Sequence, residues 1–75
     1  MNIDVEKAVG RRIRDSREAK GLTQEQLSAR LQTMGCDITR SALAKMEVGQ
    51  RHIYVDELKL IKEILGISYS DLLDR

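Results

Sequence analysis

Apolar residues recur every three to four positions along most of the chain, which is the spacing of amphipathic helices, and no stretch alternates as a strand would. Capping residues and glycines divide the pattern into five segments. The predicted helices run from about Asp4 to Gly21, from Thr23 to Gly35, from Thr39 to about Val48, from Asp56 to Gly66, and from Ser68 onward. We therefore expect one all-α domain covering residues 1–75.

The first helix carries an apolar ladder of Val5, Val9 and Ile13 at i, i+4 spacing, which should face the core. Arg17 occupies the next rung. A charge on an apolar stripe needs a partner or access to water. Arg17 is therefore expected to form an ion pair or to reach the surface.

The second helix begins with a capping box, since Gln26 lies three residues after Thr23. Leu27, Leu31 and Met34 then repeat at helical spacing before Gly35. Thr39 caps the third helix, and Ile38 and Leu43 stand at the positions of a hydrophobic staple. Leu43, Met46 and Glu47 share its inward side. The outward side carries Arg40, Ser41, Ala44, Lys45 and Val48.

Residues 49–52 form a polar turn before the fourth helix, whose many apolar positions predict a central, well-buried segment. These positions are Leu58, Leu60, Ile61, Ile64 and Leu65. Ser68 with Asp71 predicts a capped start of the last helix, stapled by Ile67 against Leu72.

The composition narrows the classes of function. A chain of 75 residues has no room for a deep cleft. Cys36 is the only cysteine, so a disulfide within the chain is excluded and a thiolate metal site is disfavoured. We expect no enzyme activity, cofactor or metal. Without a long apolar run or a signal-peptide pattern, we expect a cytoplasmic protein that does not enter a membrane.

Charge is unevenly distributed. Residues 7–51 hold ten basic and five acidic side chains, although the whole chain has a net charge of only +1. A basic body with acidic ends fits a phosphate-binding face, but solvated helices can show the same imbalance. For Arg11, Arg12 and Arg14 both interpretations remain open.

Three segments in this order, REAKGLTQEQLS, ITRSALAKMEVGQR and LGISYSDLL, resemble the Cro/repressor-type helix-turn-helix family, also called the XRE family, of bacterial and phage transcription regulators. The resemblance covers about Arg11 to Leu73. It implies a five-helix, lambda-repressor-like fold whose third helix, about Arg40 to Val48, enters the major groove.

The resemblance also implies roles for individual residues. Base contacts are implied for Arg40, Ser41, Ala44 and Lys45. Phosphate contacts are implied for Gln24, Gln50, Arg51 and His52. A structural ion pair is implied for Arg17 and Glu47, in agreement with their inward positions.

The chain departs from the family pattern after the second helix. Members usually carry glycine four residues after the small residue that is Ser28 here, but that position is Gln32, and Gly35 follows three residues later. About five extra residues separate Ser28 from Leu43. We therefore expect the second helix to run about one turn longer before the chain reverses.

These features predict sequence-specific binding to double-stranded DNA and transcriptional regulation, most simply repression by a homodimer on DNA. One alternative is an antitoxin that binds both DNA and a protein partner. Another is a helical protein-interaction module without DNA binding. Tyr54, Tyr69, Leu72 and Leu73 could line a dimer contact or complete the core.

Overall fold

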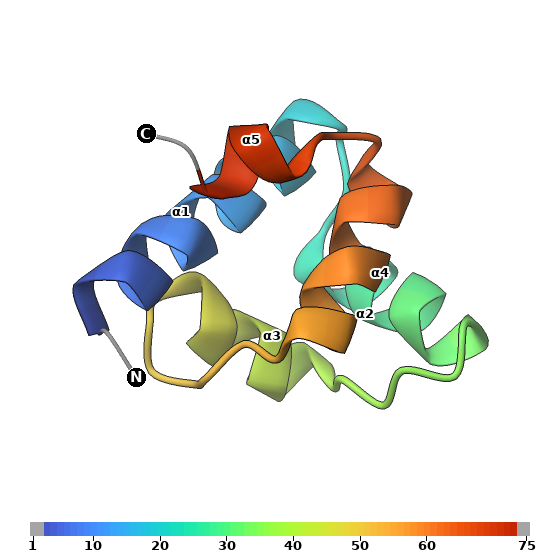
Figure 1. Cartoon of the computed structure of the whole chain (residues 1–75). Coiled ribbons are helices and arrows are strands. Elements are labelled where there is room, and N and C mark those ends of the chain that lie inside the picture. Colours follow the sequence, from blue (N-terminus) through green and yellow to red (C-terminus); the bar gives the residue numbers. More distant parts are fainter. Residues whose placement is uncertain (1–2, 74–75) are drawn as a thin grey trace.

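The five predicted helices are confirmed in a computed structural model, which describes residues 3–73 and contains no strand in that range (Figure 1). The helices are α1 (Ile3–Ala19), α2 (Gln24–Thr33), α3 (Arg40–Glu47), α4 (Val55–Leu65) and α5 (Tyr69–Leu73). None of the helices in this range is both long enough and apolar enough to cross a membrane.

The local signals place the helix starts. Thr23 Oγ1 accepts the Gln26 N–H at 3.0 Å while Gln26 Oε1 accepts the Thr23 N–H at 2.9 Å, which completes the capping box of α2. The hydroxyl of Thr39 accepts the Ala42 N–H at the start of α3. Ser68 and Asp71 exchange the same pair of bonds at the start of α5. At each start, a free backbone N–H group of the first turn is bonded by a side chain three residues away. This short spacing explains why the sequence alone predicts where these helices begin.

Helix α2 continues through Thr33, one residue past the Gln32 position at which the family pattern has glycine, and Gly35 reverses the chain with φ of 80°. The extra turn relative to other members stays a prediction. The following connection is tied back to α2 because Ser28 Oγ donates to the Ile38 carbonyl at 2.7 Å, and Gln32 Nε2 donates to the same oxygen at 3.3 Å. With Ile38 fully buried, the longer connection is anchored to the core.

The core is aliphatic and is shared by all five helices. Its buried apolar members are Val9, Ile13, Leu22, Leu27, Leu31, Ile38, Leu43, Met46, Ile61, Leu65 and Leu72. The staple residues Ile38 and Leu43 are both among them.

The prediction that Val5 faces the core is wrong, because the Val5 side chain is 53% exposed. Glu6 takes the inward position in that turn, where its carboxylate accepts the Ile53 N–H at 3.0 Å. The first turn of α1 lies at the edge of the bundle (Figure 1), where the helical periodicity continues beyond the core cluster.

Two further core predictions need correction. Met34 is 44% exposed, because it follows the last residue of α2 and caps the helix instead of facing inward. In α4 only Ile61 and Leu65 are buried, while the predicted core residues Leu58, Leu60 and Ile64 are half-buried. Helix α1 packs against α3, α4 and α5.

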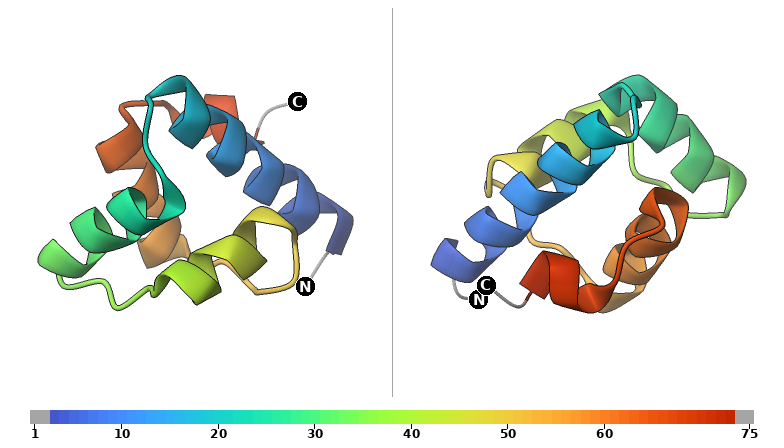
Figure 2. Two further views of the ribbon diagram at one scale, coloured as in Figure 1. Left: turned by 180° about the vertical axis from the view of Figure 1, so that it is seen from behind. Right: turned by 90° about the horizontal axis from the view of Figure 1, so that it is seen from above.

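The two helices α1 and α3 lie side by side (Figure 2, left). Gly10 makes this possible, since a Cβ at that position would overlap the Met46 carbonyl oxygen of α3. The α1 backbone therefore rests directly on the end of α3 and fixes how α3 is presented at the surface.

Candidate nucleic-acid interface

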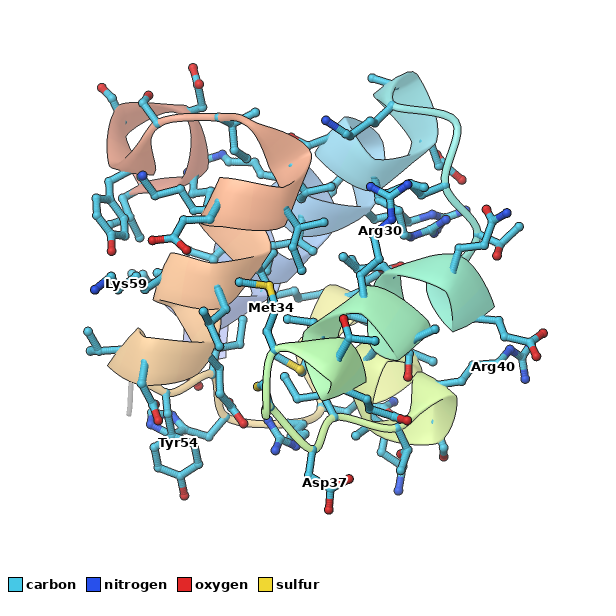
Figure 3. All side chains as sticks on the ribbon, turned by 90° about the vertical axis from the view of Figure 1, so that its right-hand side faces the viewer. Arg30, Met34, Asp37, Arg40, Tyr54 and Lys59 are labelled. Atoms are coloured by element: carbon cyan, nitrogen blue, oxygen red, sulfur yellow. The ribbon has the colours of Figure 1, made fainter. Side chains whose placement is uncertain are left out.

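The outward face of α3 is polar and exposed. Arg40, Ser41 and Lys45 are exposed, Ala44 is half-exposed, and Val48, directly after the helix, is 48% exposed. Within residues 3–73, the side chains of Arg40, Ser41 and Lys45 form no hydrogen bond or ion pair. Figure 3 shows Arg40 projecting away from the body of the protein. This face is therefore available to a ligand.

The opposite side of α3 is locked to α1. Glu47 accepts two bonds from the Arg17 guanidinium, from Nε to Oε2 at 2.8 Å and from Nη2 to Oε1 at 3.0 Å. The third bond of Arg17 runs from Nη1 to the Leu22 carbonyl at 2.8 Å. Hydrogen bonding to Glu47 raises the pKa of Arg17 against the opposing effect of burial. The structure thus brings together the two residues expected to pair.

Gln24 joins this network. Its Nε2 donates to Glu47 Oε1 at 3.0 Å, so the first residue of α2 is bonded to the last residue of α3. The two residues lie 23 positions apart, and no sequence spacing could reveal the bond. An amide nitrogen has two N–H donors, and this bond uses one of them.

The start of α2 borders a hollow on the same surface as the start of α3. Gly21, Thr23 and Gln24 line it from one side, and Arg40 lines it from the other. Backbone N–H groups at a helix start attract anions, and an arginine adds a positive charge beside them. The hollow also contains Glu25 and Glu18, whose carboxylates oppose that attraction.

The predicted phosphate-binding turn follows α3. Gly49 has φ of 77°, and Gln50 is exposed while its N–H donates to the Lys45 carbonyl at 2.8 Å. The turn is therefore folded back against the end of α3.

Arg51 is engaged within the protein. Its guanidinium holds the Glu57 carboxylate through two bonds of 3.0 Å and also donates to the His52 carbonyl. The bonds to Glu57 raise the pKa of Arg51. Burial favours a higher pKa for Glu57, but the bonds from Arg51 and the Tyr54 N–H outweigh it and leave that pKa below its ordinary value. Arg51 thus anchors the turn to α4, a role absent from the sequence prediction.

His52 is likewise bonded to a neighbouring element. Its Nδ1 lies 2.6 Å from Oε1 of Glu6 on α1, and its ring meets Tyr54 edge-on with centroids 4.6 Å apart. Glu6 and Glu57 are the residues that sequence reasoning missed here. Neither had a capping signal in the sequence, because Tyr54 has no capping side chain, although Glu57 accepts the Tyr54 N–H at 3.1 Å.

Cys36 is half-buried beside this region. Burial is the main cause of the raised pKa of its thiol, and nearby carboxylates add to it. The thiol therefore stays protonated near neutral pH. No group of three potential metal ligands occurs among residues 3–73.

Comparisons with known proteins agree with this geometry. A family model described as "Helix-turn-helix" matches residues 13–72. The chain is 29% identical to "Control protein C.BamHI" of Bacillus amyloliquefaciens over 75 residues, which cover 99% of this chain and 86% of that protein. The crystal structure of the DNA-binding domain of BldD superposes with a TM-score of 0.80 at 20% identity, over 97% of this chain and 99% of that one.

The BldD likeness establishes the fold, with α2 and α3 as the helix pair. Because the family model spans most of the chain, the protein belongs to the helix-turn-helix family of the XRE type, a family of DNA-binding transcription regulators.

Proposed function

We propose that this protein binds a specific duplex sequence in the cytoplasm and represses transcription by placing α3 in the major groove. The observation that carries the proposal is the exposed face of Arg40, Ser41 and Lys45, which has no partner within residues 3–73, on a helix whose other side is held by the pair of Arg17 and Glu47. A helix fits the major groove, and a rigidly mounted one presents its side chains at fixed positions.

The chemistry of the face suits base edges. Arg40 can bind O6 and N7 of a guanine with two bonds, and Lys45 can donate to the same atoms. Ser41 can donate or accept, and the Ala44 methyl can pack on a thymine methyl. Under this proposal, Arg40 provides the strongest discrimination between base pairs.

Phosphate contacts come from both ends of the helix pair. Gln24 offers the amide N–H that Glu47 does not use, together with the N–H groups at the start of α2. On the other side, Gln50, Arg51 and His52 approach the backbone from the turn. The bonds of Arg51 to Glu57 and of His52 to Glu6 hold this turn in one position. These contacts set the register of α3 on the duplex.

We further propose that two copies bind two half-sites about 34–36 Å apart, as helix-turn-helix dimers commonly do. Of the residues left open between dimer contact and core, Leu72 is buried, whereas Tyr54, Tyr69 and Leu73 remain at least 40% exposed and available to a second copy. Bound across a promoter, such a dimer would obstruct polymerase. The name of the relative, a control protein, agrees with a regulatory role.

The test is selection of duplexes from a random pool, followed by salt titration of the best binder. We expect a palindromic consensus and an affinity that falls steeply with salt, with a slope of about −0.9 per phosphate neutralised in logarithmic units. An unenriched pool would contradict the proposal and would favour the protein-interaction alternative.

A further inference from the structure

Three basic side chains form a row on α1. Lys7, Arg11 and Arg14 are all exposed, and their i, i+4 and i+7 spacing places them on one face of the helix. At a rise of 1.5 Å per residue the row is about 10 Å long. Duplex DNA carries one negative charge per roughly 1.7 Å of its axis, so a row of this length can face several phosphates.

The row lies beside the proposed DNA-reading surface. The same three residues border a groove whose other side includes Val48, directly after the end of α3. Helix α1 and the turn after α3 approach each other closely at Lys7, since a Cβ on Gly49 would come within 2.9 Å of the Lys7 Cα. Figure 2 (left) shows α1 and α3 next to each other on one face of the molecule. The row therefore continues the surface formed by α3 and the turn of residues 49–52.

Neighbouring Arg12 has a structural role and is not part of the row. Its guanidinium donates to the Leu72 carbonyl of α5 at 2.8 Å. Lys7 and Arg11, by contrast, form no ion pair or side-chain hydrogen bond within residues 3–73. Arg14 meets Glu18 at 3.5 Å, with both side chains more than half exposed, which contributes little to stability.

Of the acidic groups in the groove, Glu47 is neutralised by its buried pair with Arg17, whereas Glu18 meets Arg14 only in an exposed contact of 3.5 Å. Asp15 is the remaining carboxylate on the rim of the groove. Cationic charge thus predominates toward the Lys7 end, where the turn of residues 49–52 begins.

We propose that Lys7, Arg11 and Arg14 contact phosphates that flank the bases read by α3, so that α1 forms part of the DNA-binding surface. This inference rests on the proposed function and deepens it. The close packing at Gly10 holds α1 against the end of α3. The three basic residues therefore keep a fixed position relative to the DNA strand that the turn of residues 49–52 approaches. The contacts are to the backbone, so they add affinity without sequence preference.

The experiment measures affinity and its salt dependence for the selected duplex with R11Q, R14Q and the double variant. K59Q is the matched control, because it removes the same charge from an exposed residue of α4 that lies across the molecule from Arg40 (Figure 3). We expect each row substitution to weaken binding several-fold and to reduce the salt slope by about one unit, with an unchanged consensus. We expect E18Q, which removes a repulsive carboxylate, to tighten binding.

Equal affinities and salt slopes for the double variant and K59Q would overturn the inference while leaving the proposed function intact. A wild-type chain that binds no duplex would overturn both. Thermal unfolding of each variant verifies that a binding loss is not a loss of fold, and the single variants decide the question if the double variant unfolds.

Discussion

Arg17 of α1 and Glu47 of α3 form a two-bond ion pair whose side chains are only 8% and 1% exposed. The pair lies between the helix that supports the fold and the helix proposed to read DNA, and Gln24 of α2 donates to the same carboxylate. One buried carboxylate therefore connects α1, α2 and α3.

Removal of one member of this pair should destabilise the protein strongly. We expect Arg17→Ala to lower the free energy of unfolding by about 3 kcal/mol or more, because Glu47 would be left buried without its cation. The double variant R17A/E47A should lose less than R17A alone. Thermal unfolding monitored by circular dichroism measures both. If the double variant were the less stable one, the stranded-charge account would be wrong.

Gly10→Ala tests the close approach of α1 and α3. Alanine is the better helix former by about 1 kcal/mol, yet we expect a net loss of stability, since its Cβ would collide with the Met46 carbonyl. Gly21→Ala is the control: it has open space but a φ of 75°, so only backbone strain opposes it. A G10A variant as stable as the wild type would show that the two helices can separate at little cost.

Stability should depend on pH through Glu57. Its pKa is lower in the folded protein than its ordinary value of 4.5, so the unfolded chain binds the proton more readily. The stabilisation is therefore fully present above about pH 4.5 and is lost as the pH falls through the folded pKa. Urea unfolding of wild type and Glu57→Gln should show a difference in stability that narrows between pH 6 and pH 3. A constant difference would contradict the role of the Arg51 bond.

Ser28→Ala should loosen the connection between α2 and α3. The hydroxyl donates to the Ile38 carbonyl from a buried position, and loss of such a bond costs about 1–3 kcal/mol. Thr33→Ala removes an exposed hydroxyl bonded to the Arg30 carbonyl and should change stability by less than about 0.5 kcal/mol. Chemical unfolding of the two variants provides the comparison. Similar losses would mean that the anchor contributes little.

Arg40→Ala should weaken binding to the selected duplex by about 1–3 kcal/mol and relax the preference at one base pair. Arg30→Ala is a suitable control, because Arg30 is also an exposed arginine but lies on α2 (Figure 3). Competition binding with a panel of single-base variants of the site measures both effects. An unaltered base preference for R40A would remove Arg40 from the proposed base contacts.

Much of the fold could be predicted because its signals are local. The caps at Thr23, Thr39 and Ser68 each act over three residues, and the glycine turns need only their own backbone freedom. The inward position of Arg17 could be predicted because it continues the i, i+4 spacing of Val9 and Ile13. The same periodicity was misleading at Val5, since a helical pattern does not say where the neighbouring helices end.

The five helices, their order and the face of α3 that carries the cationic side chains could all be inferred from the amino-acid order, because each of these depends on residues within about one helical turn. The contacts between distant segments follow from the packing of the helices. The bonds of Gln24 to Glu47 and of His52 to Glu6, like the position of the α1 row beside Gly49, join distant segments. Such neighbours exist only once Gly10 and the buried pair have brought the helices together.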